Sequence, residues 1–296
     1  MKVLLLGGTG AMGSHLANIL SKRENNVVVT SRTTHESKEF IEYRHGNAKN
    51  LYFLRSLLSE HWDTVVDFMV YSEDEFHERA DLLLNSTSHY IFLSSSRVYD
   101  DNQNAITEDS GRLLDSSLDR VFLSTNEYSL SKARQEDILC SSNKKNWTIV
   151  RPYITYSEKR LQLGTLEKED WLYRALQGRT IVFSEDINNK LTTLTYGLDV
   201  ARGIANLVQH PNAYGEAFHI TNDYSCKWSD ILEIYLDVLE DKLGYRSKIL
   251  YQNLQDFLAW NPGKYQVIYD RLFNREFNNK KINKLNNISK IALIIS

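Results

Sequence analysis

The stretch KVLLLGGTGAMG, residues 2–13, decides the fold. Residues 3–6 are continuously apolar, as in a parallel strand that is buried on both faces. Apolar residues then recur at helical spacing over residues 16–20, after a turn that is rich in glycine. The order is therefore strand, turn and helix, and it begins at the start of the sequence.

Three glycines of this turn have separate physical roles in such a unit. Gly7 can adopt an unusual φ, Gly10 lets the backbone approach a pyrophosphate, and Gly13 allows the helix to pack closely. Glycines also mark ordinary turns, but their place between a strand and a helix predicts a dinucleotide site. The residues expected to contact the cofactor here are Gly7, Thr9, Gly10, Ala11, Met12 and Gly13.

Further strands follow at intervals along the first half of the chain. They are expected at residues 27–30, 65–70, 90–93 and 147–150, with helix-compatible stretches such as residues 76–84 between them. Strands that alternate with helices predict an α/β fold with a doubly wound parallel sheet of the Rossmann type.

The pattern changes after Arg151-Pro152, which indicates a smaller C-terminal substrate-binding lobe. A short strand is expected at residues 180–183, a helix at 199–209 and an amphipathic helix at 228–243. We expect residues 1–155 and 178–212 to form the dinucleotide-binding domain, and residues 156–177 and 213–296 to form the lobe.

Composition narrows the classes of partner. The formal net charge is −3 with acidic and basic residues interspersed, so no basic stripe indicates nucleic acid. No run approaches the roughly 20 apolar residues of a membrane span, and the start is too short for a signal peptide. We therefore expect a cytoplasmic protein. Cys140 and Cys226 are far apart, and no cysteines or histidines have metal-ligand spacing, so no metal is expected.

The end of the second strand bears on the choice of cofactor. An acidic residue there would bind the ribose diol of NAD, whereas this chain reads Thr30-Ser31-Arg32. A guanidinium can bind a phosphate bidentately, so Ser31 and Arg32 favour NADP slightly over NAD. Alternatively, Arg32 is a solvated surface side chain or stacks on the adenine.

Two clusters of residues could carry proton chemistry. Tyr128 and Lys132 stand four apart, which places them on one face of a helix. An ammonium beside a phenol stabilises the phenolate and so suits the tyrosine to acid–base work. Residues 94–96 are serines that follow a predicted strand, where open α/β sheets bind ligands. A tyrosine and a lysine at this spacing also occur by chance, but the glycine turn favours the functional interpretation.

Taken together, these features resemble the extended short-chain dehydrogenase/reductase family, whose NAD-dependent epimerase/dehydratase group acts mostly on nucleotide sugars. The likeness covers nearly the whole chain. It is carried by the glycine turn, Gly46-Asn47, the segment FLSSSRVY at 92–99, Tyr128 with Lys132 and Glu136, Arg151-Pro152 and Asp199.

The resemblance implies a catalytic triad of Ser95, Tyr128 and Lys132. Tyr128 would exchange a proton with a sugar hydroxyl or keto oxygen, and Ser95 would hydrogen-bond that oxygen. Lys132 would bind the nicotinamide ribose and keep the pKa of Tyr128 low while hydride moves. The resemblance adds Asn47, Phe68, Met69, Tyr128, Lys132 and Pro152 to the expected cofactor contacts.

Departures from the family pattern narrow the reaction. Sugar 4,6-dehydratases carry an Asp-Glu pair after the catalytic threonine, whereas this chain has Ser96-Arg97, which disfavours dehydration. Asn47 replaces a usual adenine-binding aspartate, and its amide can still hydrogen-bond the base. Residues 67–70, DFMV, replace the usual His-Leu-Ala-Ala beside the cofactor, and Ile154 stands where many UDP-sugar epimerases have a substrate-contacting asparagine.

Three functions are therefore compared. The first is an NAD(P)-dependent oxidoreductase or epimerase of a nucleotide sugar, with Arg32 favouring a reductase. The second is a non-catalytic NAD(P)-binding sensor or RNA-associated protein, which the retained Ser95, Tyr128 and Lys132 argue against. The third is a purely structural dimer subunit, for which the sequence gives no positive sign. A homodimer is expected by analogy with the family.

Overall fold

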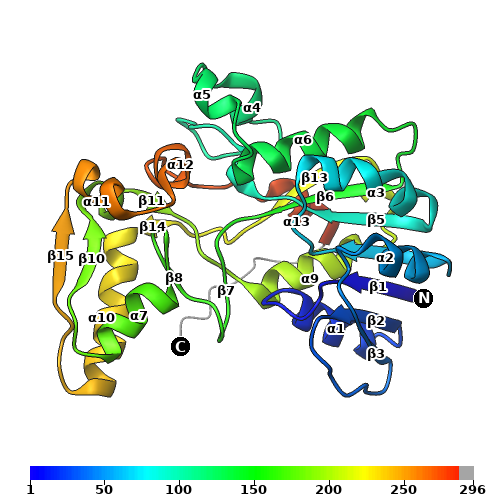
Figure 1. Ribbon diagram of the computed structural model, residues 1–296, viewed down its shortest axis with the longest axis horizontal. Coiled ribbons are helices and arrows are strands. Elements are labelled where there is room, and N and C mark those ends of the chain that lie inside the picture. Colours follow the sequence, from blue (N-terminus) through cyan, green and yellow to red (C-terminus); the bar gives the residue numbers. More distant parts are fainter. Residues whose placement is uncertain (287–296) are drawn as a thin grey trace.

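The computed structural model describes residues 1–286, and it contains a large parallel sheet with helices on both faces beside a smaller lobe (Figure 1). The seven strands lie in the order β13-β6-β5-β4-β1-β2-β3, and each neighbouring pair is parallel. They are β1 Lys2–Leu6, β2 Asn26–Ser31, β3 Ile41–His45, β4 Trp62–Asp67, β5 Thr87–Leu93, β6 Trp147–Pro152 and β13 Glu216–Ile220. The direction of winding reverses between β1 and β4, which makes the carboxyl ends of these strands the expected ligand crevice.

Alternate residues of β1 enter two different cores. Val3 and Leu5 pack with the helices on one face, while Leu4 and Leu6 pack with those on the other, and all four are fully buried. The first face is covered by α1 Gly13–Lys22, α9 Gly197–Leu207 and α13 Lys280–Asn286. The second is covered by α2 Leu51–Leu58, α3 Glu73–Asn85 and α6 Tyr128–Ser141. The continuous apolar run of β1 thus follows from burial on both sides.

The smaller lobe has its own apolar core. The strand β10 Ile181–Ser184 pairs in parallel with β15 Ile249–Gln252. Helices α7 Lys168–Leu176, α10 Trp228–Leu243 and α11 Leu254–Trp260 pack around them. Trp171, Phe183 and Trp228 are among the buried side chains that hold the lobe together. The helix expected at residues 228–243 has these bounds in the structure.

Short elements connect the two parts and rim the space between them. The strands are β7 Thr155–Tyr156, β8 Gln162–Leu163, β9 Leu166–Glu167, β11 Leu191–Thr192, β12 Thr195–Tyr196 and β14 Cys226–Lys227. The helices are η1 Ser96–Val98, α4 Leu113–Ser116, α5 Arg120–Leu123, α8 Glu185–Asn188, η2 Pro211–Ala213, α12 Lys264–Gln266 and the π-helical η3 Val267–Arg271.

The expected division of the chain differs from the structure at two strands. β13 lies in the range assigned to the lobe, yet it pairs with β6 and extends the large sheet. β10 lies in the range assigned to the dinucleotide-binding domain, yet it pairs with β15 in the lobe. A short strand carries no mark of which sheet it will join, because its partner is far away in sequence. Residues 287–296, assigned to the lobe, lie outside the described residues.

One strand ends earlier than expected. β4 stops at Asp67, three residues before the end of the apolar stretch at Val70. Phe68, Met69 and Val70 instead leave the sheet and line a cavity at its carboxyl edge. Their apolar character serves that cavity and not the strand. Over residues 1–286, no helix has the length and apolar character needed to span a membrane.

Candidate active site

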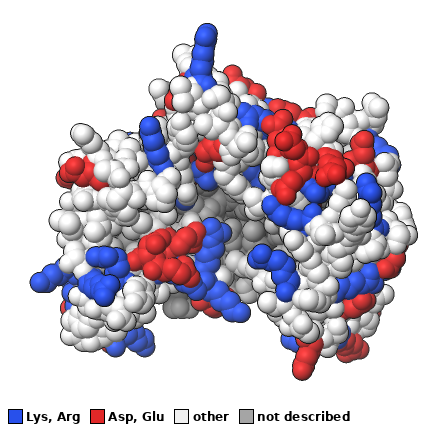
Figure 2. Space-filling view, in the orientation of Figure 1, with Lys and Arg blue, Asp and Glu red and all other residues white. Residues whose placement is uncertain are grey.

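A cavity of about 660 Å³ lies at the carboxyl edge of the large sheet and reaches the lobe. In Figure 2 the same face of the molecule is hollowed between the two parts, with acidic and basic side chains mixed around the opening. Residues from the sheet domain that line the cavity include Gly7, Gly10, Ala11, Met12, Gly13, Phe68, Met69, Ser94, Ser95, Arg97, Tyr128, Lys132 and Pro152. Residues toward the lobe include Ile154, Thr155, Arg160, Gln162, Thr165, Glu167, Gln266 and Arg271.

The glycine turn forms one end of this cavity. Gly7 has a φ of +68°, and a Cβ there would lie 2.6 Å from the sulfur of Met69. At Gly13 a Cβ would lie 2.5 Å from the carbonyl oxygen of Gly8, so the start of α1 packs directly on the turn. At Gly10, by contrast, a Cβ would meet no described atom within 4 Å.

These contacts fit a dinucleotide cofactor. No side chain of residues 1–286 caps the start of α1, although the N–H of Ser14 donates to the carbonyl of Gly10 at 3.2 Å. The other N–H groups of this first turn are the ones that could bind a ligand. They are adjacent to Gly10, where the open space leaves the backbone accessible to a pyrophosphate. The residues present could thus hold the cofactor by backbone N–H groups and the helix dipole.

The residues expected around the adenosine lie apart from the main cavity. Ser31 is buried at the end of β2, and its hydroxyl contacts Thr33 and His35 at 3.1 Å. Arg32 and Asn47 are exposed, at the ends of β2 and β3. Thr9 lines a second cavity, of about 580 Å³, next to the first. The structure therefore gathers the glycine turn, Phe68, Met69, Pro152 and the predicted triad, but not Ser31, Arg32 or Asn47.

The predicted triad comes from two neighbouring elements. Ser95 follows β5, and Tyr128 and Lys132 lie on the first two turns of α6. α6 begins where it does because the carboxylate of Glu127 accepts the N–H of Ser129 at 2.6 Å. This cap places the two side chains at the cavity, opposite the end of β5.

Lys132 is turned toward the strand. Its Nζ donates to the carbonyl of Leu93 at 2.7 Å and lies 4.5 Å from the ring centre of Phe92. The same nitrogen is 6.0 Å from the ring centre of Tyr128. Burial lowers the pKa of Lys132 to about 8, against the raising effect of Asp67 and Glu136.

The phenol of Tyr128 has a different cation nearby. Burial raises the pKa of Tyr128, and the guanidinium of Arg97 opposes this most strongly, followed by a hydrogen bond with Ser95. The Cζ atom of Arg97 lies 5.3 Å from the ring centre of Tyr128. Lys132 is expected to keep the pKa of Tyr128 low, but the largest lowering effect comes from Arg97, which in the sequence is only a departure from the family pattern.

A buried ion pair behind the triad joins α6 to β6, and Ser94, which follows β5, bonds to the same carboxylate. The hydroxyl of Ser94 donates to Glu136 at 2.5 Å, and Arg151 binds the same carboxylate through Nη2 at 2.7 Å and Nε at 2.9 Å. Glu136 and Arg151 are both buried. Both carboxylate oxygens are thereby satisfied, which makes the charge tolerable in the interior. These contacts give a structural role to Glu136 and Arg151, two residues of the family pattern.

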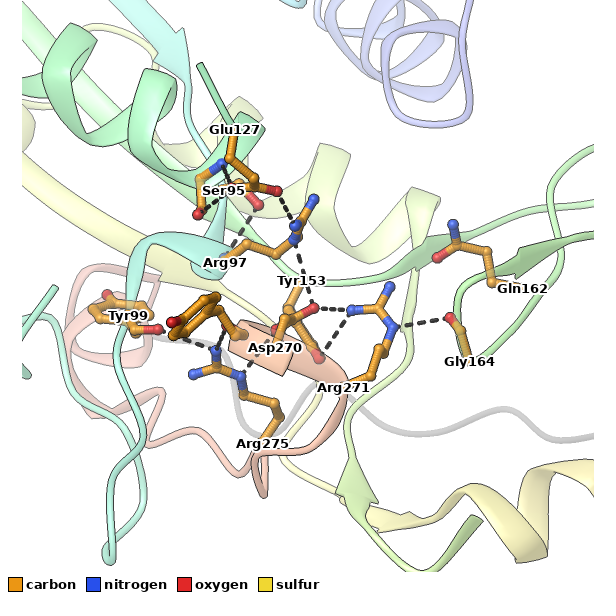
Figure 3. A network of polar contacts seen from close by, with 12 residues as sticks. Ser95, Arg97, Tyr99, Glu127, Tyr153, Gln162, Gly164, Asp270, Arg271 and Arg275 are labelled. Carbon is orange, nitrogen blue, oxygen red and sulfur yellow. Dashed lines mark hydrogen bonds and ion pairs between the residues drawn. The ribbon is translucent and has the colours of Figure 1, made fainter. Parts of the chain in front are cut away.

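A second buried network links the sheet domain to the C-terminal segment (Figure 3). Asp270, in the π-helical turn η3, is fully buried between Arg97, Arg271 and Arg275. Its oxygens lie 3.0 Å from Nε of Arg275 and 3.6 Å from Nε of Arg97, and it also binds Arg271. Arg97 binds Glu127 as well. Burial lowers the pKa of Arg271 to about 10.

Sequence reasoning missed the lobe side of the cavity. Arg271 donates from Nε to the carbonyl of Gly164 at 2.9 Å, which attaches η3 to the β8–β9 hairpin. Gln162, Thr165 and Glu167 of that hairpin also line the cavity. These residues follow no spacing rule, and they meet only because the chain folds back from residue 271 to residue 164. In residues 1–286 no cluster of three or more potential metal ligands occurs.

The fold and the site define a dinucleotide-binding α/β protein, and comparison with known families is consistent with this. The chain belongs to the NAD dependent epimerase/dehydratase family, whose model matches residues 3–221. No curated protein matches it.

Solved structures share the fold at low identity. Epimerase Mth375 from Methanothermobacter thermautotrophicus superposes with a TM-score of 0.74 at 16% identity, covering 99% of this chain and 88% of that one. UDP-glucuronic acid 4-epimerase from Bacillus cereus, in complex with UDP-glucuronic acid and NAD, gives 0.70 at 18%, covering 99% and 95%. MoeE5, in complex with UDP-glucuronic acid and NAD, gives 0.71 at 15%, also covering 99% and 95%.

Proposed function

We propose that the protein is an NAD(P)-dependent enzyme that transfers hydride between the nicotinamide and a nucleotide sugar. It would either reduce a keto-sugar or epimerise a sugar through a transient ketone. The observation that carries this proposal is that Ser95, Tyr128 and Lys132 line one cavity with the glycine turn. A proton-transfer group and a dinucleotide cradle therefore face the same space.

Each residue of the triad has a role that its surroundings support. The phenol of Tyr128 gives a proton to the sugar oxygen during reduction and removes it during oxidation. The hydroxyl of Ser95, which lines the same cavity as Tyr128, orients the same oxygen. Lys132 is held by Leu93 at the end of β5, where its ammonium can bind a ribose hydroxyl. The cofactor, when bound, supplies the hydride acceptor or donor.

The lobe side of the cavity supports an anionic substrate. Arg271 and Arg160 both line it, and a guanidinium suits the diphosphate of a nucleotide sugar. The UDP-glucuronic acid 4-epimerase and MoeE5 structures, which share this fold, contain UDP-glucuronic acid and NAD. We propose the same class of substrate for this chain, and a homodimer in the cytoplasm in keeping with the sequence analysis. Ser96-Arg97, where a dehydratase has Asp-Glu, supports redox chemistry over dehydration.

The experiment is a hydride-transfer assay with a panel of UDP-sugars and keto-sugars, followed by nicotinamide absorbance and by product analysis for epimers. We expect turnover with at least one member of the panel. Tyr128→Phe should reduce the rate by about 100-fold or more while cofactor binding persists, because only the proton-transfer group is lost. Cofactor binding without turnover on any sugar would favour a non-catalytic sensor, and no cofactor binding would refute the proposal.

A further inference from the structure

Arg97 stands beside the reactive phenol and is firmly held there. It lies in η1, a short helix that begins directly after Ser95. Its backbone N–H donates to the Ser95 hydroxyl at 3.2 Å. Its side chain is only 14% exposed and lines the cavity. Its guanidinium carbon lies 5.3 Å from the Tyr128 ring centre.

The network around Arg97 carries more positive than negative charge. Asp270 and Glu127 contribute two negative charges, while Arg97, Arg271 and Arg275 contribute three positive ones. Among the described residues joined by these ion pairs, 3 − 2 leaves one more arginine than carboxylate; Asp100 and Asp101 also act on Arg275, but neither forms an ion pair with Arg97. Arg97, which lines the cavity, therefore favours a further negative charge beside it. Ionised Tyr128 would supply that charge.

Lys132 is less well placed to stabilise the ionised form of Tyr128 alone. Its Nζ is committed to the Leu93 carbonyl at 2.7 Å and lies 6.0 Å from the Tyr128 ring centre. The nicotinamide ribose is the partner proposed for its remaining N–H groups.

We propose that Arg97 is a positioning residue whose guanidinium, together with Lys132, stabilises the phenolate of Tyr128. This inference rests on the proposed function, since it assigns Tyr128 the role of acid and base. The charged groups that face Tyr128 are Arg97 from η1, Lys132 and Glu127 from α6, and Arg160 from the loop before β8. Arg97 and Arg160 favour the phenolate, whereas Glu127 opposes it.

The test is a spectroscopic titration that needs no substrate. The ultraviolet absorbance of tyrosinate is followed against pH, and the signal of Tyr128 is isolated as wild type minus Tyr128→Phe. Arg97→Gln is titrated against its own Tyr128→Phe double variant. We expect Arg97→Gln to raise the Tyr128 midpoint by about one pH unit or more, because an opposite charge at this range is lost. Arg97→Lys should keep part of the stabilisation, since the charge remains.

Glu127→Gln gives a control of opposite sign. Its amide oxygen can still accept from Ser129 and Arg97, but a negative charge beside Tyr128 is removed, so the midpoint should fall. General damage to the site would shift the Tyr128 midpoint in the same direction in both variants. An unchanged midpoint in Arg97→Gln, or a rise in Glu127→Gln, would overturn the inference; if Arg97→Gln does not fold, Glu127→Gln and Arg97→Lys still decide it. Because the free protein is titrated, failure of the sugar assay leaves this result independent.

Discussion

The two ends of the cavity are built in opposite ways. The glycine-turn end comes from one continuous segment, residues 2–22, whose close backbone contacts need small side chains. The lobe end includes Arg271, and the buried charges that hold Arg271 join segments as far apart as Arg97 and Arg275. One end depends on space and the other on charge compensation. Different substitutions should therefore break them.

The largest effect is expected at the lobe end, from Asp270→Asn. This change leaves Arg97, Arg271 and Arg275 buried with one carboxylate fewer. We expect a loss of about 3 to 5 kcal/mol in the free energy of unfolding, measured by urea denaturation. The matched control is Asp237→Asn, because Asp237 binds Arg246 at 2.7 Å on an exposed face and should leave stability unchanged. Equal effects from the two variants would show that burial does not set the strength of the network.

The glycine-turn end should be broken by volume instead. Gly13→Ala places a Cβ against the backbone carbonyl of Gly8, which cannot give way easily, so we expect a loss of about 1 to 3 kcal/mol in stability. Gly10→Ala has open space and should fold normally, yet its methyl group would occupy the approach to the pyrophosphate. Urea denaturation and cofactor titration of both variants separate the two roles. The comparison fails if Gly10→Ala also lowers the free energy of unfolding, or if its affinity for the cofactor equals that of the wild type.

The same contrast explains how far the sequence could predict this site. The glycine turn, the ends of β5 and α6, and the residues Ser95, Tyr128 and Lys132 lie on local patterns, and the structure brings them to one cavity. Arg271, Gln162 and Glu167 depend on contacts between distant segments, for which no local spacing exists. Arg97 was visible only as a departure from a motif. Its role emerges once Asp270 is placed beside it, 173 residues later in the chain.

Local sequence patterns also could not predict which sheet the outlying strands would join. The alternation of strand and helix predicts the parallel sheet, and burial on both faces explains the apolar run of β1. β13, EAFHI, and β10, IVFS, are both short strands, yet one completes the large sheet and the other forms part of the lobe. Their partners, β6 and β15, decide the outcome.

Buried charge also occurs near the glycine-turn end, at Asp67, and it should be visible as a pH effect. Burial raises the pKa of Asp67 to about 6, although Met69, Tyr90 and Tyr71 all donate to it. The folded state therefore holds this proton to a higher pH than the unfolded state does, so stability falls as pH rises. We expect a loss of about 2 kcal/mol from about pH 4 to about pH 7, absent in Asp67→Asn. Denaturation of both proteins across this range is the measurement, and parallel pH profiles would contradict it.

The smallest effect concerns Arg32, at the exposed edge of the glycine-turn end. The Arg32 side chain is exposed at the end of β2, so its removal should leave the fold intact. If it binds the 2′-phosphate of NADP, Arg32→Ala should weaken NADPH binding about tenfold and leave NADH binding unchanged. Fluorescence titration with both cofactors tests this, and raised salt should reduce the difference because the contact is exposed. Tighter binding of NADH than of NADPH in the wild type would contradict the preference for NADP. A cofactor retained through purification would favour an epimerase over a reductase.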